Sequence, residues 1–121
     1  KFVKKDLIIF APLGIGNHID HKIIKEIGYK LIKKGYHVLF YEDIPYEDNL
    51  NNQAIKALTK GMHHYTAKIS LNDKIDIIKD YNSQVNPELL NYIRNITLTR
   101  RGERIWGKGD SLKYLPKEMF T

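Results

Sequence analysis

Two short apolar runs separated by one amphipathic segment constrain the fold of this chain most strongly. Residues 7–10 and 38–41 are rich in β-branched, Leu and aromatic side chains, as expected for strands buried on both faces. Between them, residues 18–34 place apolar side chains at helical spacing, and the Lys-Lys-Gly run at 33–35 is a typical helix stop. This order predicts a βαβ unit with parallel strands and a right-handed crossover.

The rest of the sequence adds weaker elements. With two strong parallel strands and one weaker strand, the chain offers about half of a doubly wound sheet. We therefore expect an α/β fold with a mostly parallel sheet, in a single domain over residues 1–121 that is part of a longer protein. The expected later elements are a loop (42–52), a short helix (53–60), an edge strand (63–71), a helix capped by Asn72, a helix from Pro87 through Ile93, and a last strand or extended tail (97–106).

Composition and charge exclude several classes of function. The chain has no Cys, which excludes disulfides, thiolate metal sites and a Cys nucleophile. The net charge is +6, but 16 of the 20 cations are Lys, and residues 37–59 are net negative. Nucleic-acid readers depend on Arg and on aromatic residues interleaved with cations, so we favour a solvated Lys-rich surface and expect no nucleic-acid partner. The apolar runs are too short for a signal peptide or a membrane span, which predicts a cytoplasmic protein.

The loop after the first predicted strand is the place where open α/β sheets bind ligands. It carries two glycines, but Ile19 stands where a dinucleotide fingerprint needs its third glycine, which excludes that site. His18 and His21 follow, three residues apart at a helix start for which Asn17 is the expected N-cap, so both rings are expected on one helix face. Such a pair could supply one zinc ligand and one acid/base group, or two ligands. Two solvated histidines at a polar helix start would have the same spacing, and a catalytic zinc takes three protein ligands.

These residues resemble a known motif. Residues 12–21, ending in His18-Ile19-Asp20-His21, resemble the second metal motif of the PIG-L/LmbE family of zinc-dependent N-deacetylases, which act on N-acetylglucosamine-type sugars. That motif is a His-x-Asp-His at a helix start after a strand. Three further segments resemble family segments in the same order and extend the resemblance to residue 106. They are Tyr41-Glu42-Asp43-Ile44-Pro45-Tyr46, Lys74 with Tyr81-Asn82-Ser83-Gln84, and Gly102-Glu103-Arg104-Ile105-Trp106.

The resemblance implies a fold, a cofactor and residue roles. The fold would be a Rossmann-like (LmbE-like) three-layer α/β fold, of which this chain is the C-terminal half. By resemblance, His21 is a zinc ligand, His18 protonates the leaving amine or stabilises the oxyanion, and Asp20 orients a His or caps the helix without binding zinc. The family's first motif, Ala-His-Pro-Asp-Asp-Glu, supplies two further ligands and the general base, and it does not occur here. We therefore expect the remaining zinc ligands outside this chain and no activity from the chain alone.

Other polar residues fall into two groups. Glu42 and Asp43 end the second predicted strand, at the same sheet edge as the two histidines, and they either bind substrate hydroxyls or begin a loop. His63 and His64 are adjacent, so on a strand they point to opposite faces and do not readily share a metal. The residues expected to be structural or on the surface are His37 and a cluster of Arg100, Arg101 and Arg104.

Two functions stay open on the sequence alone. The leading hypothesis is the C-terminal portion of a zinc-dependent hydrolase that removes the N-acetyl group from an N-acetylglucosamine-type sugar, with the N-terminal half of the same protein as its partner. The alternative is a small non-catalytic α/β binding module with an incidental His pair. The sequence does not specify the acyl sugar, the metal bound in the cell or the oligomeric state.

Overall fold

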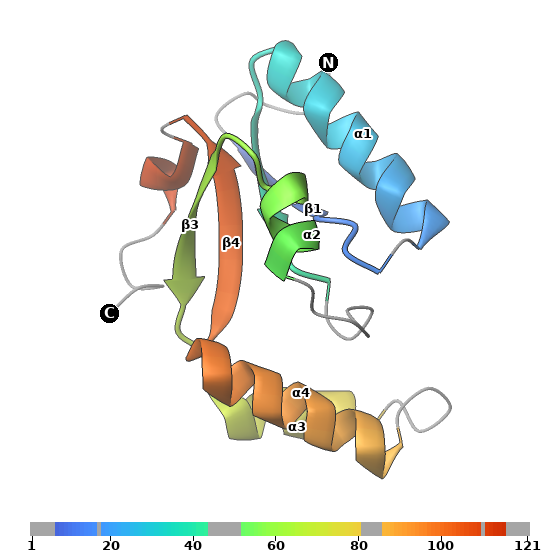
Figure 1. Cartoon of the computed structure of the whole chain (residues 1–121). Helices are drawn as coiled ribbons and strands as arrows, with labels where there is room; N and C mark the ends of the chain where they lie inside the picture. The colour runs from blue at the N-terminus through green and yellow to red at the C-terminus, as the bar shows by residue number, and fades with distance from the viewer. Residues whose placement is uncertain (1–6, 17, 44–51, 81–85, 110, 116–121) are drawn as a thin grey trace.

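The computed structural model describes residues 7–16, 18–43, 52–80, 86–109 and 111–115. In these residues four strands form a single sheet, and the helices lie between the strands in the chain (Figure 1). In chain order the elements are β1 (Ile8–Pro12), α1 (Ile19–Lys33), β2 (His37–Tyr41), α2 (Asn52–Leu58), β3 (Met62–Ala67), α3 (Leu71–Ile78), α4 (Pro87–Arg100), β4 (Glu103–Lys108) and the 3-10 helix η1 (Ser111–Tyr114).

The predicted βαβ unit is confirmed. Strands β1 and β2 pair in parallel, with Ile8 opposite His37 and Pro12 opposite Tyr41. Helix α1 connects them and packs against both strands. The helix ends at Lys33, and Gly35 follows with a φ of +92° in the turn that leads to β2. The local signals in the sequence, two apolar runs and a helix stop, were sufficient because the three elements pack mainly on one another.

The sheet is mixed, whereas the sequence indicated a mostly parallel one. Its strand order is β1-β2-β4-β3, and β4 runs antiparallel to both β2 and β3. Residues 97–106, expected to form a last strand or an extended tail, divide between two elements: α4 continues to Arg100, and the strand starts only at Glu103. Helices α3 and α4 pack together beyond one end of β3 and β4 (Figure 1) and return the chain antiparallel.

A sharp reversal between α4 and β4 sets this antiparallel return. Arg101 lies in the left-handed region with a φ of 60°, and Gly102 has a φ of 145°. The Gly102 amide donates to the Thr97 carbonyl at 3.2 Å and closes the helix end. A Cβ on Gly102 would lie 2.2 Å from the Ala67 carbonyl oxygen, so no larger residue fits between the two strands here.

Helices α1 and α2 cover one face of the sheet. Val38 and Phe40 of β2 are buried there. They form one core with Ile55 of α2, and Tyr29 and Ile32 of α1 pack against it. This core ties the βαβ unit to the segment that leads into β3.

The opposite face of the sheet is covered only in part. Leu39 and Ile105 are buried there against Leu112 of η1. Toward the carboxyl ends of β1 and β2, Phe10 and Tyr41 on the same face remain 46% and 41% exposed. This open part of the sheet face lies next to His21, at the start of α1.

The starts of α1, α2 and α3 differ from the predicted ones by one or two residues, whereas α4 begins at Pro87 as predicted. His18 is the residue before α1 and makes no side-chain cap, while Asn17 lies outside the described residues. Helix α3 is capped by Ser70, whose Oγ accepts from the Asp73 amide at 3.3 Å, and not by Asn72. Asn86 caps α4 by accepting from the Leu89 amide at 2.8 Å. Within the described residues no helix is long and apolar enough to cross a membrane.

Candidate active site

The parallel pairing of β1 and β2 brings the loop after β1, the first turn of α1 and residues 42–43 to one edge of the sheet. The Leu13 amide donates to the Tyr41 carbonyl at 2.8 Å and extends the pairing by one bond. Gly14 then takes a φ of 81°, which turns the loop toward the start of α1. The predicted convergence of His18, His21, Glu42 and Asp43 at this edge follows from this geometry.

Asp43 is the residue that holds the site together. The residue is 3% exposed, and its carboxylate takes part in three hydrogen bonds. Oδ1 accepts from the Gly14 amide at 2.9 Å and the Ile15 amide at 3.1 Å, and Oδ2 lies 2.9 Å from His21 Nδ1. Since a carboxylate only accepts, Nδ1 of His21 donates, and the ring is fixed in one tautomer and orientation. Both Asp43 oxygens are therefore engaged within the protein.

Glu42 is anchored on the other side of β2. Its side chain is fully buried and forms a two-pronged ion pair with Arg104, in which Nη2 donates to Oε1 at 2.7 Å and Nε donates to Oε2. The Trp106 indole also donates to Oε2 at 3.2 Å. The expectation that Arg104 belongs to a surface cluster is wrong, because β4 lies next to β2 and places this side chain against Glu42.

The two histidine rings lie on one face of the helix start, as their spacing predicts. Their centroids are 4.9 Å apart and the ring planes are tilted by 36°. His21 is the more buried, with a side chain 22% exposed, and His18 is 41% exposed. Asp20, expected to orient a histidine, is 74% exposed and lies 4.0 Å from Nδ1 of His18. Asp43, which was expected either to bind substrate hydroxyls or to begin a loop, instead hydrogen-bonds His21.

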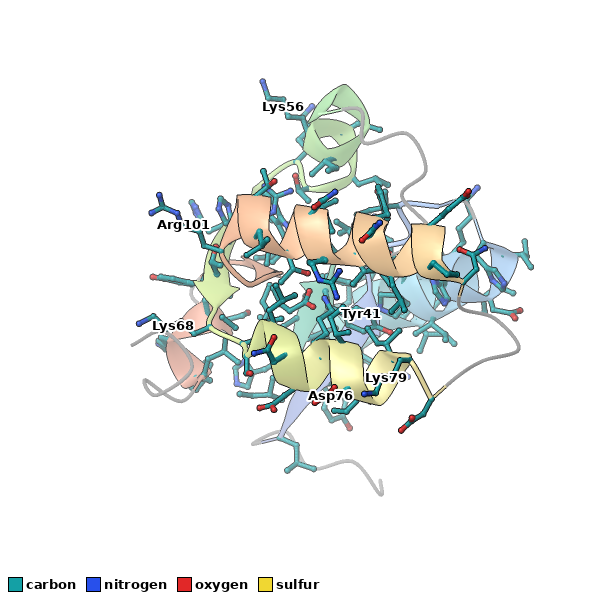
Figure 2. All side chains as sticks on the ribbon, turned by 90° about the horizontal axis from the view of Figure 1, so that it is seen from below. Tyr41, Lys56, Lys68, Asp76, Lys79 and Arg101 are labelled. Carbon is teal, nitrogen blue, oxygen red and sulfur yellow. The ribbon has the colours of Figure 1, made fainter. Side chains whose placement is uncertain are left out.

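A cavity of about 450 Å³ opens beside His21 and Asp43. Its wall includes Phe10 and Tyr41 from the open sheet face, and Lys74 and Glu103 from α3 and β4. Burial, followed by the nearby Asp43 carboxylate, raises the pKa of Tyr41, so its phenol stays protonated. Figure 2 is seen from the α3–α4 end, and in this projection Tyr41 is visible between the ribbons of the two helices.

Lys74 and Glu103 form an ion pair on the cavity wall. The Lys74 ammonium also donates to the hydroxyl of the buried Thr97 on α4, at 3.2 Å. Sequence reasoning assigned no role to this pair, because the contact joins residues 29 positions apart on separate elements. The only signal was that both residues fall in segments that resemble the deacetylase family.

A catalytic zinc takes three protein ligands and leaves one position open. A histidine held at Nδ1 by a buried carboxylate is the usual arrangement of a metal-bound imidazole, and His21 with Asp43 fits it. Across the part of the chain that the structure describes, however, no three His, Asp or Glu side chains are placed to hold one metal. The described residues thus offer an oriented ligand but do not complete a zinc site.

The remaining histidines lie elsewhere. His63 and His64 are neighbours on β3. The His64 ring packs against the Trp106 ring, with the ring centroids 4.5 Å apart. Burial, with the Arg104 charge as a further cause, lowers the pKa of His64. His37 stacks on Tyr114 at 4.0 Å.

Comparison with known proteins gives one local similarity. A stretch of 33 residues, 27% of this chain, is 44% identical to 2'-N-acetylparomamine deacetylase of Niallia circulans and covers 12% of that enzyme's length. The chain matches no protein-family model and no solved structure. The local match indicates a relationship to a deacetylase, and a deacetylase is a hydrolase.

Proposed function

We propose that this chain is the C-terminal portion of a zinc-dependent N-deacetylase that acts on an N-acetylglucosamine-type sugar. The observation that carries the proposal is the His21–Asp43 hydrogen bond beside His18 at the carboxyl ends of two parallel strands. The local similarity to a deacetylase supports it independently of the geometry.

Each side chain has a distinct task in this proposal. Asp43 keeps the Nδ1 proton on His21, which directs Nε2 of that ring toward the metal. His18, the more exposed of the two rings, donates a proton to the leaving amine or stabilises the oxyanion. Asp20 lies beside His18 and favours its orientation. A zinc ion, when bound, supplies an activated water and polarises the amide carbonyl.

The remaining ligands and the general base are proposed to come from an N-terminal half of the same protein. The incomplete donor set of the described residues supports this part of the proposal. The chain alone is then expected to deacetylate nothing measurable. Robust hydrolysis of an N-acetylglucosamine derivative by the purified 121-residue chain would contradict the proposal.

The incomplete donor set also favours a second candidate, a non-catalytic α/β binding module. Zinc content separates the two. In the complete protein we expect bound zinc that is lost on His21→Ala and kept on His63→Ala, a matched change at a histidine on β3 away from the site. A protein that binds no zinc even when saturated with it would support the binding module instead.

A further inference from the structure

The cavity beside His21 contains polar groups that the protein itself does not fully use. An ammonium group has three donors, and the described residues provide Lys74 with two acceptors, Glu103 and Thr97. Lys74 reaches Glu103 through Oε1, and no described residue donates to Oε2. The Tyr41 hydroxyl likewise has no hydrogen-bond partner among the described residues. A donor and an acceptor therefore stand side by side on the wall of one cavity.

The same cavity has an aromatic wall. In the parallel register Pro12 lies opposite Tyr41, and side chains alternate along a strand, so Phe10 and Tyr41 lie on one face of the sheet. Both are large aromatic side chains that remain 46% and 41% exposed, although they sit on sheet strands. A cavity with apolar aromatic surface and a few convergent polar groups is the usual composition of a small-molecule site.

Glu42 and Asp43 are poorly suited to bind a ligand directly. The Glu42 carboxylate is occupied by Arg104 and Trp106, and the Asp43 carboxylate by the loop amides and His21. Releasing either for a ligand would leave buried partners without an acceptor. The partly exposed pair of Lys74 and Glu103, at 16% and 29% side-chain exposure, carries no such cost.

We propose that this cavity is a sugar subsite, in which Lys74 and Glu103 bind two neighbouring hydroxyls of a pyranose ring whose apolar face rests on Phe10 and Tyr41. The inference rests on the proposed function, because it places the substrate sugar beside His21. A hydroxyl both donates and accepts, so of two neighbouring hydroxyls one accepts from the Lys74 ammonium and the other donates to the Glu103 carboxylate. Thr97 and the Lys74–Glu103 ion pair hold these two groups in place before the sugar arrives.

The test is sugar binding to the complete protein in the presence of a chelator, so that it is independent of zinc. The probe is methyl β-N-acetylglucosaminide, followed by NMR shifts of the protein and by saturation transfer to the sugar. We expect shifts at Phe10, Tyr41 and Glu103, and at least a tenfold weaker affinity for Lys74→Met and for Glu103→Gln. A matched control is Lys79→Met, at the C-cap of the same helix and in an exposed pair with Asp76 (Figure 2), which should bind as the unchanged protein does.

A further variant guards against loss of folding. Tyr41→Phe keeps the ring and removes only the hydroxyl, and it should weaken binding less than Lys74→Met. The subsite is overturned if the complete protein does not bind the sugar, or if Lys74→Met and Glu103→Gln fold and bind it with unchanged affinity. Binding that responds as expected, in a complete protein that holds no zinc and deacetylates nothing, would retain the subsite and refute the proposed function.

Discussion

Nδ1 of His21 lies 2.9 Å from Oδ2 of Asp43, and this contact joins the first turn of α1 to the end of β2. The other Asp43 oxygen receives two amides of the loop that precedes the helix. One buried carboxylate therefore fixes both the loop and the orientation of the histidine. We therefore expect both the stability of the fold and the affinity for zinc to depend on Asp43.

Asp43→Ala should lower the free energy of unfolding by about 2 kcal/mol or more, because the Gly14 and Ile15 amides lose their acceptor. Asp43→Asn keeps one oxygen for the loop amides and should fold, but it no longer presents a carboxylate to His21. In the complete protein we expect its zinc affinity to fall by roughly 10- to 100-fold. Urea unfolding and zinc titration measure the two effects, and unchanged zinc affinity in Asp43→Asn would remove Asp43 from the site.

Glu42→Ala should be one of the most destabilising single changes at this edge of the sheet. It leaves the Arg104 guanidinium and the Trp106 indole without their acceptor. We expect a loss of about 3 kcal/mol, the lower end for a broken buried pair, because Arg104 retains some contact with solvent. Asp76→Ala, which breaks the exposed pair with Lys79, should leave the unfolding midpoint unchanged. Equal midpoints for the two variants would contradict the buried ion pair.

Gly102→Ala tests the reversal that makes the sheet mixed. The new Cβ would approach the Ala67 carbonyl oxygen to 2.2 Å at a φ of 145°, so both steric overlap and backbone strain oppose it. The matched control is Gly61→Ala, where φ is +77° and nothing lies within 4 Å of the added Cβ. We expect the control to lose about 1 kcal/mol of unfolding free energy from backbone strain alone, and Gly102→Ala to lose clearly more. Thermal unfolding of the two variants side by side measures the difference.

Lys25 predicts a specific pH dependence. It is 7% exposed on α1, and desolvation lowers its pKa from 10.5 against the opposing charges of Asp43 and Glu26. Between that lowered value and 10.5 the folded state binds fewer protons than the unfolded state, so this group adds stability as the pH rises through that window. Relative to Lys25→Met, the unchanged chain should therefore gain stability as the pH approaches 10.5.

Denaturant unfolding of both proteins across the alkaline range measures this gain. Lys79→Met is the control. The hydrogen bond and charge of Asp76 raise the pKa of Lys79, so the contribution of Lys79 to stability changes with pH in the opposite direction. A constant stability difference between the unchanged chain and Lys25→Met over that range would show that Lys25 is not desolvated in the folded protein.

The local parts of the fold could be read from the sequence, and the long-range parts could not. The β1–α1–β2 unit follows from residues 7–41 alone, because apolar runs and a helix stop are local signals. The antiparallel β4 depends on α4 reaching Arg100 and on the reversal at Gly102 against Ala67. That contact is tertiary, and nothing in residues 97–106 indicates which strand they will meet.

The site shows the same division. The spacing of His18 and His21 predicted rings on one face, and their centroids are 4.9 Å apart. The order of parallel strands predicted that Asp43 would lie at the same edge. The hydrogen bond of Asp43 to His21 joins residues 22 positions apart, and the Lys74–Glu103 ion pair joins residues 29 positions apart. Both contacts depend on tertiary packing, which no local sequence pattern predicts.

The division of labour between the two histidines is the central claim, and zinc content measured together with turnover tests it most directly. In the complete protein, His21→Ala should lose its zinc, because the Asp43-held ring is the proposed ligand. His18→Ala should keep its zinc while turnover falls by roughly 10²-fold or more, because that ring acts on the substrate. Both variants keeping their zinc, or His18→Ala losing it while His21→Ala does not, would contradict these roles.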